Sequence, residues 1–145
     1  MSDDLKAKAR RIWEEIFPNA DIEALAEVTH PDVVDHDDPP GAPQGFEGAR
    51  STMLWLHGVF SDQQWDIHHV LAEGDMVAVH CTMRATHTGD LMGIAPTGRR
   101  VEMDYVHLLR FEDGRVKDRW AVRDDMALMR QLGAIGGAPS GATVS

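Results

Sequence analysis

Apolar residues recur at helical spacing along the first part of the chain. They return every three or four positions over residues 5–17, and the interruption at Pro18 predicts the end of a first helix. Asp21 can cap a second, shorter helix that runs out near residue 29. A loop rich in proline and glycine follows, and a third apolar stripe predicts a helix over about residues 47–60. The first part of the chain is therefore expected to be mostly helical.

The pattern changes to strands after Ser61. Turn signals divide the following region into four extended segments, over residues 64–72, 76–87, 99–112 and 115–124. Because two of the turns are too short for a parallel crossover, the segments are predicted to form an antiparallel meander. Strands of this length twist and coil, so the sheet is expected to wrap around the helices. The sequence predicts an α+β fold, a cone-shaped barrel with a cavity that suits a small molecule.

One domain accounts for the whole pattern. A last helix is predicted from Asp125 to Gly133, and small residues dominate the chain beyond it. We expect residues 1–133 to form a single domain and residues 134–145 to form a flexible tail. A length of 145 residues agrees with one domain of ordinary size.

The charge balance excludes two classes of partner. With 14 basic and 24 acidic residues the net charge is −10, so nucleic acid and an anionic membrane would be repelled. The single cysteine, Cys81, cannot form an intramolecular disulfide. The chain opens with charged residues rather than a signal peptide, and its apolar runs are too short to span a bilayer. We expect a cytoplasmic protein that binds a small hydrophobic or aromatic substrate.

Strict alternation of side chains across each strand predicts which residues face the cavity. The more apolar set of each strand is assigned to the concave side. The ionisable groups of this set are chiefly His69, His107 and Asp124, of which the last two lie in the third and fourth strands. Together with one residue of the third helix, the concave set supplies the candidate substrate contacts Trp65, His69, Met83, Tyr105, Trp120 and Met53.

His107 and Asp124 suit acid–base chemistry. A carboxylate in an apolar site is desolvated, which raises its pKa and makes it a better base near neutral pH, so Asp124 is the candidate base. His107 can donate a hydrogen bond to a developing oxyanion or return the proton. The alternative for Asp124 is structural, because it lies at a junction between strand and helix and can cap the last helix.

A metal site is not expected. The chain has eight histidines, but none is spaced as in the usual zinc motifs, and His68 and His69 are predicted to point to opposite faces of their strand. The acidic run at residues 35–38 is either a solvated loop or a rim of the cavity.

Three segments of the sequence resemble one known family. They are HPD and VDH within residues 30–36, THTGDLMGIAPTGRR at 86–100, and the run from Phe111 to Asp124 that precedes a helix ending in QLG. The chain resembles the SnoaL-like polyketide cyclase (ester cyclase) family of the NTF2-like superfamily, over nearly all of residues 5–133. Arg119 and Asp125 depart from the family's usual pattern.

The resemblance implies a cofactor-independent cyclase or isomerase that closes a ring of a polyketide-like substrate by intramolecular aldol condensation. It assigns the base that removes the proton alpha to a carbonyl to Asp124, and it implies supporting roles for His107 and His36. It also implies a homodimer or homotetramer. Two alternatives remain at this point: the same base activates water in a hydrolase or hydratase, or the cavity only binds a hydrophobic metabolite.

Overall fold

The computed structural model describes residues 2–38 and 41–135. Along the chain the elements are α1 (Ser2–Arg11), the π-helical turn η1 (Ile12–Ile16), α2 (Phe17–Asn19), α3 (Ile22–Val28), β1 (Thr29–Asp35), α4 (Gly45–Val59), β2 (Phe60–Glu73), β3 (Met76–His87), β4 (Arg100–Glu112), β5 (Arg115–Arg123) and α5 (Asp125–Leu132). The part of the predicted tail beyond residue 135 lies outside the described residues.

The first helical region is longer than predicted. Pro18 is tolerated because it occupies the first turn of α2, where its missing N–H is not needed. The helix ends instead at Ala20, whose backbone is left-handed with φ 49°. Asp21 caps α3 as predicted, and its side chain accepts a hydrogen bond from the backbone N–H of Ala24 at 3.1 Å.

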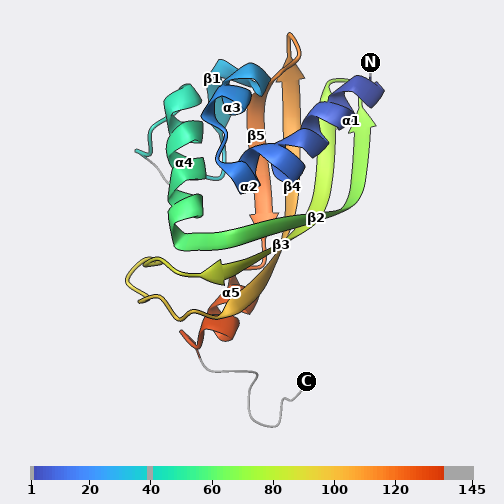
Figure 1. Ribbon diagram of the computed structural model, residues 1–145. Helices are drawn as coiled ribbons and strands as arrows, with labels where there is room; N and C mark the ends of the chain where they lie inside the picture. The colour runs from blue at the N-terminus through green and yellow to red at the C-terminus, as the bar shows by residue number, and fades with distance from the viewer. Residues whose placement is uncertain (1, 39–40, 136–145) are drawn as a thin grey trace.

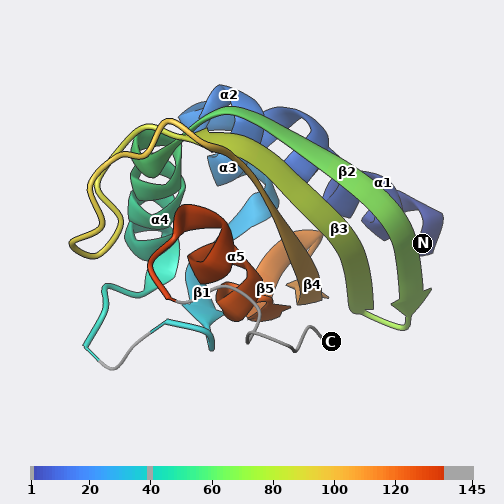
Figure 2. The same ribbon diagram turned by 90° about the horizontal axis from the view of Figure 1, so that it is seen from below.

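The strands form one curved, mixed sheet in the order β1-β5-β4-β3-β2. The four long strands pair antiparallel, and β1 pairs parallel with β5. Helices α1, α2 and α3 cross one side of the sheet, and α4 lies beside β1 (Figure 1). Seen from below, the strands bend into an arch with α5 beneath it (Figure 2). The α+β cone is confirmed, although the sheet is not closed.

Two of the register shifts in the sheet are β-bulges that interrupt the alternation assumed in the sequence analysis. On β5, Val116 pairs with Phe111 while Asp118 pairs with Arg110, so Lys117 is an extra residue. On β2, a similar shift between Ile67 and His69 makes His68 the extra residue. Because the period of a strand is two residues, each bulge exchanges the faces of every residue that follows it.

The apolar core lies between the concave face and the helices. Met53 of α4 and Met83 of β3 are fully buried within it. Both were predicted to contact substrate, but they fill the core and do not line the cavity described below. In the described part of the chain, no helix is long and apolar enough to cross a membrane.

Candidate active site

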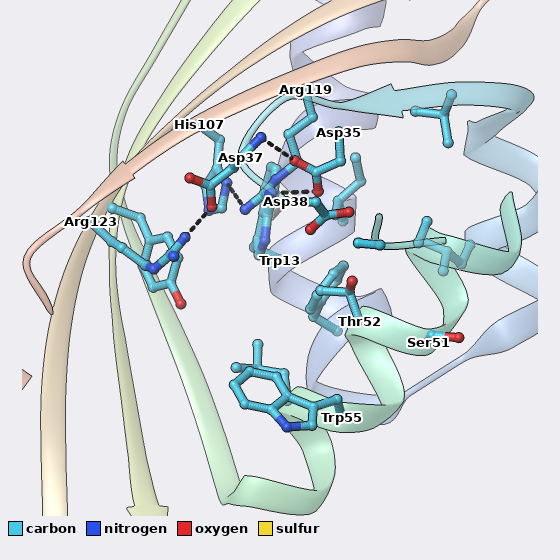
Figure 3. Close-up of a pocket in the computed structure, with 18 of the residues that line it drawn as sticks. Trp13, Asp35, Asp37, Asp38, Ser51, Thr52, Trp55, His107, Arg119 and Arg123 are labelled. Atoms are coloured by element: carbon cyan, nitrogen blue, oxygen red, sulfur yellow. Dashed lines mark hydrogen bonds and ion pairs between the residues drawn. The ribbon is translucent and has the colours of Figure 1, made fainter. Parts of the chain in front are cut away.

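The space between the sheet and the helices holds a cavity of about 660 Å³. Its walls are mainly apolar, and Trp13 of η1, Trp65 of β2 and Tyr105 of β4 contribute large rings. Trp55 of α4 lines the cavity on the opposite side and is partly exposed (Figure 3). Trp65 and Tyr105 are thus placed in the cavity wall, where the sequence analysis expected them. A cavity of this size and character suits a flat, mostly apolar ligand.

Charged residues gather on one side of this cavity, where the end of β1 meets β5 (Figure 3). Arg119 pairs with Asp35, with 2.7 Å between Nη1 and Oδ2. Arg123 pairs with Asp37 through Nη1 and with Asp125 through Nε, the latter at 3.1 Å. Two arginines and several carboxylates therefore share the wall of an otherwise apolar space. The acidic run at residues 35–38 forms a rim of the cavity, one of its two predicted interpretations.

His107 is the most deeply buried ionisable group of the cavity, with 1% of its surface exposed. Its ring stacks on Trp13 at a centroid distance of 3.9 Å and on Tyr105 at 4.9 Å. Nη2 of Arg119 lies 3.3 Å from its Nδ1. Burial, followed by the positive charges of Arg119 and Arg123, holds the pKa of His107 well below its ordinary value. The imidazole is therefore neutral at physiological pH.

Asp38 differs from the other carboxylates of the cavity in its contacts. Within the described parts of the chain, neither an ion pair nor a hydrogen bond engages its side chain. Burial raises its pKa above the ordinary value, and the neighbouring carboxylates of Asp35 and Asp37 add to this effect. Arg119 and Arg123 oppose the shift without reversing it. Asp38 therefore has the properties expected of a general base: it is available, partly desolvated and in contact with the cavity.

Asp124 occupies a different place from the one predicted. Its side chain accepts a hydrogen bond from the backbone N–H of Ala127 at 3.0 Å and caps α5, the structural alternative considered for it. It is exposed and does not line the main cavity. The prediction that Asp124 faces the concave side was wrong because the bulge at Lys117 reverses the faces of β5.

The same bulge moves Trp120 to the outer face of the sheet, where it meets the predicted site residue His36. Trp120 pairs with Leu108 and is 36% exposed, so it does not line the cavity. His36 stacks on Trp120 at a centroid distance of 4.5 Å, and its Nε2 lies 2.9 Å from Oδ1 of Asp118. The structure thus brings His36 and Trp120 together, but outside the cavity.

His69 is also turned away from the cavity, by the bulge at His68. Its ring stacks on that of His80, and the two Nδ1 atoms are 3.0 Å apart. In the described residues, no group of three or more histidine, cysteine or acidic side chains is arranged to hold a metal ion.

Arg119 and Arg123 are the functional candidates that the sequence analysis missed. Alternation assigned both to the outer face together with Lys117, because charged residues were expected there. The bulge instead places Arg119 opposite Leu109 and Arg123 opposite Tyr105, on the concave face. Neither Gly nor Pro marks the bulge in the sequence, so alternation offered no signal for it.

Comparison with known proteins decides the family. The profile of the SnoaL-like polyketide cyclase family matches residues 7–132, most of the chain. The chain belongs to this family. As a member of the SnoaL-like family, it is an enzyme of the cyclase type, and the resemblance found in the sequence is confirmed.

Two similar proteins are named as cyclases of aklanonic acid methyl ester. Aklanonic acid methyl ester cyclase DauD of Streptomyces sp. (strain C5) is 29% identical over 119 residues, which cover 81% of this chain and 71% of DauD. Aklanonic acid methyl ester cyclase DnrD of Streptomyces peucetius is 29% identical over 117 residues, which cover 79% of this chain and 78% of DnrD.

Solved structures of similar proteins share the fold of this SnoaL-like chain. IdmH of Streptomyces antibioticus, a putative polyketide cyclase, is 32% identical with a TM-score of 0.77, and the match covers 89% of this chain and 98% of IdmH. AclR of Streptomyces galilaeus, a putative hydroxylase, is 28% identical with a TM-score of 0.85, covering 99% of this chain and 93% of AclR. The names of these relatives describe more than one activity on the same architecture.

Proposed function

We propose that this protein closes a ring of an aromatic, polyketide-like substrate by an intramolecular aldol reaction. The cavity is large and apolar enough for a flat ligand, and its charged groups gather on one side. The similar curated proteins are named as cyclases of aklanonic acid methyl ester, which makes that ester a suitable first substrate to test.

Asp38 is the proposed general base, and the observation that carries the proposal is its carboxylate in the cavity, which has no partner among the described residues. It removes the proton alpha to a carbonyl, and the resulting enolate carbon attacks a second carbonyl of the same molecule to form the new C–C bond. The alkoxide produced in that step takes the proton back from Asp38. The reaction is balanced without an oxidant or a further reactant.

Arg119 is placed to stabilise the negative oxygen of the enolate. Its side chain lines the cavity and is 21% exposed. A guanidinium has five N–H donors, and within the described residues one bond to Asp35 and one to His107 occupy them. The remaining donors can meet an oxyanion, a stabilisation that is worth several kcal/mol in a site shielded from water.

Paired carboxamide variants test the assignment of the base. We expect Asp38→Asn to lower kcat on aklanonic acid methyl ester by about 10²–10⁴-fold, the usual contribution of general base catalysis. Asp124→Asn, the variant of the residue that the family resemblance implies, is expected to keep most of its turnover. The opposite result, with Asp124→Asn inactive and Asp38→Asn active, would return the role of base to Asp124.

The pH profile gives a second test of the base. Because the pKa of Asp38 is raised, the acid limb of kcat/KM is expected above the ordinary aspartate value near 3.8. Product formed in ¹⁸O-labelled water separates ring closure from the water-activating alternative, since the aldol step adds no oxygen from water. Incorporation of one solvent oxygen, beyond simple carbonyl exchange, would favour a hydrolase or hydratase.

A further inference from the structure

We propose that His107 is a positioning residue, a neutral imidazole whose Nδ1 accepts a hydrogen bond from Arg119 and aims that guanidinium at the substrate oxygen. This inference rests on the proposed function for the role of Arg119. It differs from the role that the sequence predicted, in which His107 itself donates a hydrogen bond to the oxyanion or returns the proton.

The chemistry of the two groups fixes the direction of this hydrogen bond. A guanidinium only donates, so the contact of 3.3 Å requires a lone pair on Nδ1 of His107. The proton of the neutral ring is then on Nε2. Nε2 is buried and has no hydrogen-bond partner within the described residues. Within the described residues, the imidazole therefore forms its hydrogen bond through Nδ1.

Packing holds the accepting atom still. The imidazole stacks on Trp13 with an angle of 19° between the ring planes, and on Tyr105 with an angle of 12°. Since two aromatic rings stack on the imidazole and restrict its rotation, the lone pair of Nδ1 keeps one direction. On the other side of the guanidinium, Asp35 anchors Arg119 at 2.7 Å. Two fixed acceptors define the orientation of the guanidinium, whose side chain lines the cavity (Figure 3), and its other N–H groups remain for a ligand.

The surroundings keep His107 in its accepting form. A protonated imidazole would place a second positive charge against Arg119 and close to Arg123, in a site where the ring is buried. Arg119, which the neutral ring positions, is thus itself one of the groups that oppose protonation of the ring. Arg119 should keep its orientation over the whole pH range in which the protein is folded and His107 is neutral.

Amide isosteres separate the two nitrogens of His107. The side-chain oxygen of asparagine can accept near the position of Nδ1, whereas the amide nitrogen of glutamine can donate near the position of Nε2. With aklanonic acid methyl ester we expect His107→Asn to lower kcat less than tenfold, and His107→Gln and His107→Leu to lower it about 100-fold. KM should change little in all three variants. Retention by His107→Gln with loss in His107→Asn would overturn the proposal in favour of direct donation from Nε2.

A spectroscopic measurement decides the tautomer without any substrate. Long-range ¹H–¹⁵N correlation of the folded protein at pH 7 is expected to show His107 protonated at Nε2 and unprotonated at Nδ1, with His107→Asn as the assignment control. A signal protonated at Nδ1 would overturn the proposal even if ring closure is observed. Conversely, a correct tautomer without any cyclase activity would refute the proposed function and leave the hydrogen bond to Arg119 intact.

Arginine variants complete the test. Arg119→Met removes both the charge and the donor, so the Nδ1 resonance of His107 should shift and the pKa of His107 should rise. Arg123→Met removes a similar charge without a hydrogen bond to the ring, so it is the matched control. We expect Arg123→Met to raise the pKa of His107 with a smaller change in the Nδ1 resonance. Equal changes in that resonance would show that the contact with Arg119 is not a hydrogen bond.

Discussion

Nη2 of Arg119 lies 3.3 Å from Nδ1 of His107, across two neighbouring strands of the sheet. The contact exists because Lys117 is an extra residue in β5, which turns Arg119 toward the concave face. Without that residue, strict alternation would send Arg119 outward and Trp120 inward. A single β-bulge thus converts an apolar wall into one that carries a fixed positive charge beside His107. Bulges next to active sites commonly redirect side chains in this way.

The cap formed by Asp124 should be measurable as stability. Asp124→Ala removes the acceptor for the N–H of Ala127 and is expected to lower the free energy of unfolding by about 1 kcal/mol. Asp124→Ser keeps an acceptor at the same position and should lose much less. Urea denaturation of the two variants provides the comparison. Equal losses in both would indicate that the side chain contributes through something other than the cap.

Tyr105 is the only tyrosine of the chain, so its titration can be followed as a probe of the cavity wall. Burial raises the pKa of Tyr105 from its ordinary value near 10.0 to about 12. Absorbance of tyrosinate at 295 nm should therefore titrate near pH 12 in the folded protein and near the ordinary value in urea. Because the unfolded chain loses this proton first, the contribution of Tyr105 to stability is full below about pH 10 and is lost up to about pH 12. The loss amounts to about 2–3 kcal/mol, and it should be absent in Tyr105→Phe.

Gly58 and Gly89 lie close together, and replacing each of them with alanine should change the stability of the protein in opposite directions. A Cβ on Gly89 would lie 2.1 Å from the carbonyl oxygen of Gly58, and the N–H of Gly89 donates to Val59 at 3.0 Å. Gly89→Ala is therefore expected to destabilise the protein by about 1–3 kcal/mol. A Cβ on Gly58 meets no atom within 4 Å, and this residue is in α4. Gly58→Ala should stabilise the protein by about 0.5–1 kcal/mol. Thermal denaturation of both variants checks the prediction, which is wrong if Gly89→Ala raises the Tm or Gly58→Ala lowers it.

Tryptophan fluorescence can locate the bound ligand. Trp13, Trp55 and Trp65 line the cavity, whereas Trp120 is on the outer face. A neutral anthraquinone ester quenches indole fluorescence and can serve as the probe. Its titration should saturate in both the wild-type protein and Trp120→Phe, with the same affinity for the two. Trp55→Phe should show a smaller quenched amplitude. If Trp120→Phe abolished the quenching, the ligand would bind to the outer face and the cavity would not be its site.

The local pattern of the sequence determined most of the elements. The predicted helix over residues 47–60 corresponds to α4, and the four extended segments correspond to β2, β3, β4 and β5. Hydrophobic periodicity and turn residues act over a few neighbouring positions, so they can be read directly from the chain. The same local information placed Tyr105 and His107 correctly, because β4 pairs with β3 without a register shift and alternates regularly along its length.

The composition of the site was decided by tertiary structure. Which face Arg119, Asp124 and His69 occupy depends on bulges at Lys117 and His68, and a bulge is a property of the pairing between two strands. The parallel pairing of β1 with β5 then brings Asp35 to Arg119, 84 positions apart in the chain. Periodicity within a strand carries no information on either event, since an extra residue leaves the types of its neighbours unchanged while reversing their directions. The sequence by itself determined that a cone with a cavity would form, and the pairing of its strands decided which charges enter it.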